Sequence, residues 1–147
     1  MVKKEIADIL GPGSHASTFG GGPVVCKAAL AVLKTIHKER LLNKTNISAE
    51  YLLTQLNALK DKYPIITDIR AKGLMIGIEL KAKGKEVAGQ CIDRGLLINC
   101  THEKVLRLMP ALIVTKKEID QAVSVLGEVF SRLNDFNSSG GIPPLNE

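Results

Sequence analysis

The feature that most constrains this chain is a glycine-rich loop that runs directly into an apolar helical pattern. The loop spans residues 11–23 and reads Gly11-Pro-Gly-Ser-His-Ala-Ser-Thr-Phe-Gly-Gly-Gly-Pro23. So many glycines and prolines exclude a helix or a regular strand through the loop. Its hydroxyl and backbone N–H groups come just before a helix start, where unpaired N–H groups and the helix dipole attract an anion. Composition alone leaves two interpretations open: an anion-binding loop or a mobile linker.

The composition is typical of one globular domain. The chain has 147 residues, which is enough to bury a core. Hydrophobic residues make up 45% and aromatic residues only 3%, so the core is expected to consist of Leu, Ile, Val and Ala. The net charge of +5 comes from scattered lysines rather than a basic block, which argues against a nucleic-acid partner. No stretch has a signal-peptide pattern or the length of a membrane span. We therefore predict a cytoplasmic protein with no membrane partner.

The cysteines predict neither a disulfide framework nor a metal site. Cys26, Cys91 and Cys100 form no Cys-x-x-Cys pair, and no histidine lies at metal-ligand spacing. Because three cysteines cannot all pair within one chain, we expect reduced and mostly buried thiols.

Apolar residues recur at helical spacing after the loop. Gly22 and Pro23 are typical of a helix start, because proline has no N–H to leave unpaired there. The spacing predicts a first helix from Pro23 to about Leu42, ending at Asn43. Ser48 is the expected N-cap of a second helix, which Pro64 stops.

The rest of the chain alternates strands and helices. We predict strands at 65–72, 74–80, 95–99 and 105–109, a helix over 84–94 with Val87, Cys91 and Ile92 inward, and a final helix behind a capping box at 115–118. This order predicts an α+β fold of two layers, with a small, mostly antiparallel sheet and helices packed on one face. The expected organisation is a loop and lead-in at 1–22, a small domain at 23–136 and a flexible tail at 137–147.

Several stretches resemble the class III pyridoxal-phosphate-dependent aminotransferases, in the same order along the chain. His15-Ala-Ser-Thr-Phe-Gly-Gly-Gly-Pro23 is similar to that family's His-Gly-Ser-Thr-Phe-Gly-Gly-Asn-Pro segment, from which Ala16 and Gly22 depart. Three further stretches agree, although Ala111 replaces the second proline of the family's Leu-Arg-Phe-x-Pro-Pro-Leu pattern. They are Ile69-Arg-Ala-Lys-Gly-Leu-Met-Ile-Gly-Ile-Glu79, Gly95-Leu-Leu-Ile-Asn-Cys-Thr101, and Val105-Leu-Arg-Leu-Met-Pro-Ala-Leu112 with the following Thr115-Lys-Lys-Glu-Ile-Asp120.

The resemblance implies specific roles for three residues. In the family, the residue that matches Thr18 reaches the cofactor phosphate of the partner subunit, with Ser17 alongside. The residue that matches Arg107 grips the substrate α-carboxylate, a task that suits the planar fork of arginine. From the residues alone, Thr18 can instead be a turn or capping hydroxyl, and Arg107 an exposed arginine of an edge strand. Arg70 and Glu79 are interpreted as a local ion pair.

The resemblance also implies a larger enzyme. Family members fold as type I pyridoxal-phosphate transferases, work as homodimers, and hold the cofactor on a lysine Schiff base in a large domain that precedes the loop. Lys3 and Lys4 lack the family context of that lysine, so we expect no catalytic residue here. The chain is therefore interpreted as a C-terminal domain fragment that alone is inactive and does not bind the cofactor.

The expected reaction of the intact enzyme is transamination between N-acetylornithine and 2-oxoglutarate, a step of arginine biosynthesis. Succinylornithine, ornithine or 4-aminobutyrate aminotransferases are alternatives within the family. A different class also stays open, namely a non-catalytic module that binds an anion or another protein.

Overall fold

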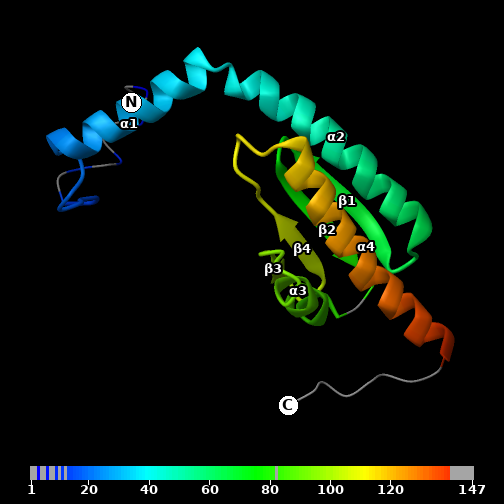
Figure 1. Cartoon of the computed structure of the whole chain (residues 1–147). Helices are drawn as coiled ribbons and strands as arrows, with labels where there is room; N and C mark the ends of the chain where they lie inside the picture. Colours follow the sequence, from blue (N-terminus) through cyan, green and yellow to red (C-terminus); the bar gives the residue numbers. More distant parts are fainter. Residues whose placement is uncertain are drawn as a thin grey trace. The chain divides into compact units, whose positions relative to one another are not determined.

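The computed structural model describes residues 3, 6, 9, 11, 13–81 and 83–139, with side chains described as far as residue 133. The chain divides after Arg40 into two compact units (Figure 1). The first unit carries the glycine-rich loop and helix α1, and the second carries a four-stranded sheet with helices α2, α3 and α4. None of the described helices is long and apolar enough to cross a bilayer.

Helix α1 (Pro23–Lys38) begins where the sequence predicts, with Pro23 in its first turn and Gly22 as an extended N-cap. The backbone N–H of Cys26 donates to the Gly22 carbonyl at 2.9 Å, which starts the helical ladder. No residue of α1 is buried. The apolar stripe of this helix therefore does not form a core in the described part of the chain.

The predicted boundary between the first two helices is wrong. The chain turns at Arg40, whose φ of 51° is left-handed, and α2 (Leu41–Lys62) begins at the next residue. The expected terminator Asn43 and the expected cap Ser48 both lie inside α2. The reason is a continuous buried face at helical spacing, which overrides the local preference of these polar residues. Its members are Leu41, Thr45, Ala49, Leu52 and Leu56.

The sheet is small and entirely antiparallel, which confirms the predicted α+β fold. Its strands are β1 (Ile66–Lys72), β2 (Met75–Leu80), β3 (Asn99–Thr101) and β4 (Val105–Leu108), in the order β1-β2-β4-β3. Strand β4 is therefore an interior strand. This corrects the alternative that placed Arg107 on an edge strand, because β3 pairs with the far side of β4.

The strand predicted at 95–99 is wrong in position. Strand β3 starts only at Asn99, and Leu97 is 87% exposed. Two features set this register. The backbone N–H of Leu96 bonds back to the Cys91 carbonyl at the end of α3, so the chain is still turning at this point. The hairpin tip at His102 and Glu103, both with positive φ, then brings Asn99 opposite Arg107.

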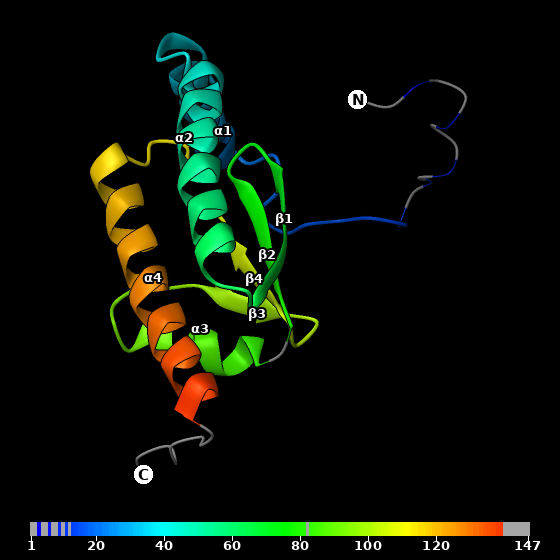
Figure 2. The same cartoon turned by 90° about the vertical axis from the view of Figure 1, so that its right-hand side faces the viewer.

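The helices of the second unit pack on one face of the sheet, as predicted. Helices α2 and α4 (Lys116–Ser139) run alongside each other over it, and α3 (Gly84–Ile92) contacts β3, β4 and α4 (Figure 2). Val87 and Cys91 of α3 are buried as expected, but Ile92 is 49% exposed, so its predicted inward position is wrong. One core joins the layers. Its most buried members are Leu52, Leu56, Ile76, Ile78, Leu80, Val87, Leu106, Leu126, Val129 and Phe130.

The predicted capping box opens α4. The Thr115 backbone N–H donates to a carboxylate oxygen of Glu118 at 2.7 Å, and the Glu118 N–H donates to the Thr115 hydroxyl at 3.3 Å. These reciprocal bonds satisfy two N–H groups that the helix itself leaves unpaired. Helix α4 continues to Ser139, and the remainder of the tail predicted at 137–147 lies outside the described residues.

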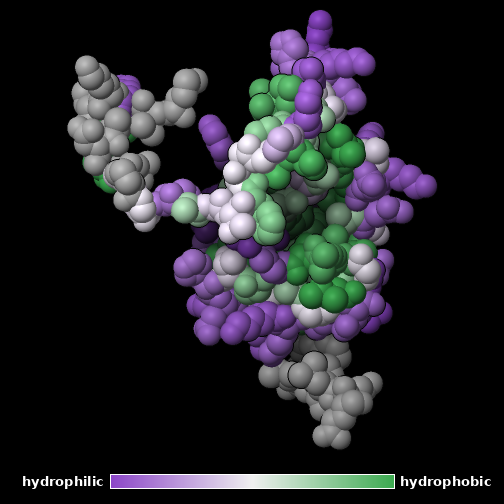
Figure 3. All heavy atoms as spheres, turned by 90° about the vertical axis from the view of Figure 1, so that its left-hand side faces the viewer, coloured by the Kyte–Doolittle hydropathy of each residue, from purple (hydrophilic) through white to green (hydrophobic). Residues whose placement is uncertain are grey.

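The alternation of side chains along β2 and β4 leaves the second face of the sheet uncovered within this unit. Ile76 and Ile78 point into the core, whereas Met75, the first residue of β2, is 56% exposed. Arg107 lies between the buried Leu106 and Leu108, and so projects from the opposite face. We call this the open face of the sheet. Apolar side chains gather on the side of the molecule drawn in Figure 3.

Candidate functional site

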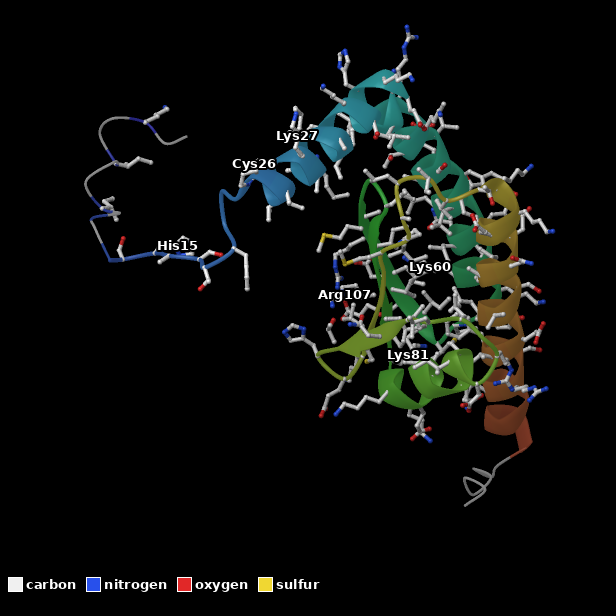
Figure 4. All side chains as sticks on the ribbon, turned by 60° about the vertical axis from the view of Figure 1, so that its left-hand side comes forward. His15, Cys26, Lys27, Lys60, Lys81 and Arg107 are labelled. Atoms are coloured by element: carbon white, nitrogen blue, oxygen red, sulfur yellow. The ribbon has the colours of Figure 1, made fainter. Side chains whose placement is uncertain are left out.

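The glycine-rich loop places Ser17 and Thr18 in an exposed turn just before α1. Residues 18–25 line a shallow hollow of about 500 Å³. The hollow is thus built from the loop and the first turn of the helix alone. His15 lies earlier in the same loop (Figure 4).

Two glycines of this turn suit its geometry. A Cβ atom on Gly20 would come within 3.1 Å of the Ser17 Cβ, and the Gly20 N–H already donates to the Ser17 hydroxyl at 3.1 Å. Gly21 has a φ of 79°, a left-handed conformation that side chains disfavour. The turn therefore brings backbone N–H groups close to the two hydroxyl-bearing residues.

The donors around the hollow suit a phosphate. Gly22 provides no side-chain cap, and the first turn of α1 contains no acidic residue. Pro23 has no N–H, and the N–H groups of Val24 and Val25 precede the first bond of the helical ladder, which Cys26 makes, so they have no partner within the helix and lie at the positive end of its dipole. In the described part of the chain, no group is hydrogen-bonded to the Thr18 hydroxyl. Hydroxyl and N–H donors without a competing carboxylate are the chemistry that a phosphate dianion requires.

Arg107 occupies the middle of the open face. It lies on β4 opposite Gly77 of β2 on one side and opposite Asn99 of β3 on the other. Its Nε–H donates to the Asn99 Oδ1 at 3.2 Å. Figure 4 shows the side chain on the side of the sheet away from α2 and α4. The arginine is therefore exposed, and its one described side-chain partner is neutral.

The carboxylates of the open face are bound by a different arginine. Arg70 of β1 donates to Asp68 at 2.8 Å and to Glu79 at 2.6 Å, so it forms the ion pair that the sequence predicts. Hydrogen bonds to Glu79 and Asp68 raise the pKa of Arg70, and the bond from Arg70 lowers the pKa of Asp68. Glu79 pairs across the strands with Val105, two positions from Arg107. Arg70 thus holds the carboxylate that lies diagonally from Arg107.

The charge of Arg107 has no carboxylate counterion among the residues that the structure describes. No carboxylate lies in ion-pair or hydrogen-bond contact with it among the described residues. Gly77, its neighbour on β2, has no side chain to cover it, and a Cβ there would come within 3.3 Å of the Val105 side chain. An arginine presented in this way on a sheet can accept an incoming carboxylate with two parallel hydrogen bonds.

The structure does not test the predicted roles of Ser17, Thr18 and Arg107, but it does place the residues. Ser17 and Thr18 belong to the first unit and Arg107 to the second. The described residues contain no cluster of His, Cys, Asp or Glu suited to a metal ion. Sequence reasoning missed Asn99, whose position opposite Arg107 follows only from the register of the β3–β4 hairpin.

Comparisons with known proteins agree on one family. The family described as "Aminotransferase class-III" matches residues 1–130. The acetylornithine aminotransferase of Methanocaldococcus jannaschii is 41% identical over 133 residues, which cover 90% of this chain and 33% of the relative. The ornithine aminotransferase of Halalkalibacterium halodurans is 38% identical over 120 residues, which cover 82% of this chain and 30% of the relative. The chain thus spans about a third of the length of these curated relatives.

Solved structures show the same fold. The acetylornithine aminotransferase of Elizabethkingia anophelis matches 85% of this chain and 34% of its own, with a TM-score of 0.76 and 28% identity. The ornithine δ-aminotransferase of Plasmodium falciparum matches 92% of this chain and 36% of its own, with a TM-score of 0.81 and 25% identity. Both the sequence and the fold lead to one conclusion: this chain belongs to the class-III aminotransferase family.

Proposed function

We propose that this chain forms the C-terminal part of a pyridoxal-phosphate-dependent aminotransferase that transfers an amino group between N-acetylornithine and 2-oxoglutarate. The observation that carries the proposal is Arg107, a cation on an open sheet face whose described side-chain partner is the neutral Asn99. An α-amino or α-oxo acid needs a fixed cation for its α-carboxylate. A guanidinium fork supplies that cation with a defined orientation.

In this proposal the glycine-rich loop binds the cofactor phosphate. The hydroxyl of Thr18, together with Ser17 and the N–H groups at the start of α1, forms a donor set that fits a phosphate dianion and contains no repelling acid. Bound pyridoxal phosphate supplies an electron sink for the bond cleavage at the substrate α-carbon. Following the family resemblance, the phosphate held by this loop belongs to the cofactor of the partner subunit in a homodimer.

In this proposal the residues of this chain bind the substrate and the cofactor rather than transfer protons. Arg107 orients the substrate by its carboxylate, and the loop anchors the cofactor of the partner subunit by its phosphate. Fixing the carboxylate restricts the orientations of the substrate, which lowers the entropic cost of the reaction. The lysine that takes and returns protons belongs, in this proposal, to a part of the enzyme that these 147 residues do not contain.

N-acetylornithine is proposed as the amino donor because the names of several relatives at 40–41% identity carry it. Ornithine is the second candidate, because ornithine aminotransferases match at 38% identity. The test is a steady-state assay of the complete enzyme that contains this chain, with each donor in turn and 2-oxoglutarate as acceptor. A higher kcat/KM for N-acetylornithine supports the proposal, and a higher value for ornithine replaces it with the second candidate.

The role of Thr18 has its own test. In the complete dimer, Thr18→Ala removes one charge-assisted hydrogen bond, worth about 1.5–3 kcal/mol, and should weaken cofactor affinity about tenfold or more. Thr54→Ala is the matched control, because Thr54 lies on α2 and donates its hydroxyl only to its own helix at the Glu50 carbonyl. Equal cofactor affinity in the two variants would remove Thr18 from the phosphate site.

The chain alone should bind no cofactor covalently and should not transaminate. Covalent capture of the cofactor needs an activated lysine, and Lys3 and Lys4 lack the family context of that lysine. A visible absorbance titration of the 147-residue chain with pyridoxal phosphate, paired with an assay on N-acetylornithine and 2-oxoglutarate, checks this. A saturable visible band accompanied by turnover would show that the reacting lysine lies within this chain.

A further inference from the structure

We infer that Asn99 is a positioning residue for Arg107: it holds the guanidinium through a neutral hydrogen bond and leaves both terminal amino groups free for a substrate carboxylate. The inference rests on the proposed role of Arg107 and deepens it. Asn99 lies on β3, carries no charge and acts on the substrate only through Arg107.

The geometry of the hairpin creates this contact. Asn99 and Arg107 are direct cross-strand partners in the antiparallel pair of β3 and β4. Side chains that lie directly opposite each other have Cβ atoms about 5 Å apart, so they reach each other without bending the strands. The observed bond joins the Arg107 Nε–H to the Asn99 Oδ1 at 3.2 Å. It restrains the guanidinium plane beside β3.

The choice of nitrogen matters for binding. A guanidinium can accept a carboxylate either at its end, through both Nη groups, or at its side, through Nε and one Nη. Because Asn99 occupies Nε, the side approach is blocked and the end approach remains. On the opposite flank stands Gly77, which has no side chain. Gly77 therefore leaves this flank of Arg107 uncovered by a side chain.

The neutrality of Asn99 matters as much as its position. An aspartate at this place would form an ion pair with Arg107 inside the protein and would compete with the substrate for the same charge. The only described carboxylates near this face, Asp68 and Glu79, are both bound to Arg70. Two acids thus pair with Arg70, and one of them, Asp68, also pairs with Lys60, whereas Arg107 is hydrogen-bonded to a neutral amide.

The first experiment observes the hydrogen bond in the 147-residue chain. Nitrogen-15 NMR detects arginine Nε–H groups, and the Arg107 signal is assigned as the one that disappears in Arg107→Lys. We expect this proton to exchange slowly with water in the unmodified chain and at least about tenfold faster in Asn99→Leu, because the acceptor is gone. Asn57→Leu on the exposed side of α2 is the control, with no expected change. An equal exchange rate in the unmodified chain and in Asn99→Leu would overturn the inference.

The second experiment measures the consequence in the complete enzyme. Asn99→Asp should raise the KM for both the amino donor and 2-oxoglutarate about tenfold or more, with a smaller change in kcat, because it adds a competing carboxylate. Asn57→Asp adds the same charge to α2, away from the open face, and should leave both constants unchanged. Circular dichroism of each variant confirms that the fold is retained.

The outcomes separate the inference from the proposal on which it rests. If Arg107→Lys raises the KM values and Asn99→Asp does not, the positioning role of Asn99 is wrong while the carboxylate role of Arg107 stands. If Arg107→Lys leaves both KM values unchanged, the carboxylate role fails, and the inference about Asn99 fails with it. A parallel rise of KM in Asn99→Asp and Arg107→Lys supports both.

Discussion

Replacement of Gly84 by alanine is expected to destabilise the second unit by crowding the hairpin that carries the candidate site. Gly84 is the first residue of α3, and its N–H donates to the Glu103 carbonyl at 3.0 Å. An added Cβ would lie 2.6 Å from the Cys100 Sγ, 2.7 Å from the Glu103 carbonyl oxygen and 3.1 Å from the Lys104 Cα. Two of these three atoms belong to the backbone and cannot rotate away. Overpacking of this kind costs roughly 1–3 kcal/mol or more.

Gly89 in the same helix provides the matched control. It is exposed, it is helical, and a Cβ there would meet nothing within 4 Å. Gly89→Ala should therefore stabilise the chain by about 0.5–1 kcal/mol, because alanine loses less backbone entropy in a helix. The assay is urea unfolding of the 147-residue chain followed by circular dichroism at the helix band. If the two variants shift the midpoint equally or in the same direction, the close packing of α3 on the hairpin is refuted.

Three further predictions concern other parts of the fold. Arg40→Gly should raise the free energy of unfolding by about 1 kcal/mol, because Arg40 has a φ of 51°, whereas Arg40→Ala should give no gain in the same urea titration. Thr115→Ala should lower the free energy of unfolding by about 0.5–2 kcal/mol, since it removes the acceptor of the Glu118 N–H, and a loss below about 0.3 kcal/mol would contradict the capping role. Burial raises the pKa of the Cys91 thiol to about 11 from an ordinary value of 9.0. The unfolded thiol ionises first as pH rises, so the stability due to Cys91 should be complete below pH 9 and lost between about 9 and 11. Across this pH range, the free energy of unfolding should fall less steeply with pH in Cys91→Ala than in the unmodified chain. Identical pH slopes in the two proteins would contradict the burial effect.

The sequence predicts the interior of the second unit well, because period and burial agree there. Leu74, Ile76, Ile78 and Leu80 alternate strictly in the sequence, and all four are buried. A shift of one residue would expose this whole set, so the pattern alone fixes the face of β2. The capping box at Thr115 is predictable for a similar reason, since both partners lie within one helical turn.

The errors occur where a local signal competes with packing. Asn43 is a good helix terminator and Ser48 a good N-cap, yet both lie inside α2 because Leu41 is buried and begins the helix earlier. The end of α1 depends on Arg40 in a left-handed conformation, which is uncommon for arginine and gives no signal in the sequence.

In the candidate site, too, some features can be predicted from the sequence and others cannot. Arg107 can be selected from the sequence alone, because it is a charge within an apolar strand. Its bond to Asn99 cannot, because the sequence places Asn99 at the end of a strand over 95–99 and the true register depends on the hairpin tip. The pair of Arg70 with Glu79 is predicted from the sequence, but the further bond of Arg70 to Asp68 and the position of Arg107 beside this pair depend on the strand register.

The measurement that tests the central claim most directly is the KM of the complete enzyme for 2-oxoglutarate in the Arg107→Lys variant. Lysine keeps the positive charge but loses the planar fork, so the carboxylate role predicts a rise of about tenfold or more in KM for 2-oxoglutarate and for the amino donor. Arg132→Lys is the control, because Arg132 is exposed on α4, away from the open face, and should behave as the unmodified enzyme. KM values in Arg107→Lys equal to those of Arg132→Lys would contradict the claim that Arg107 holds the substrate carboxylate.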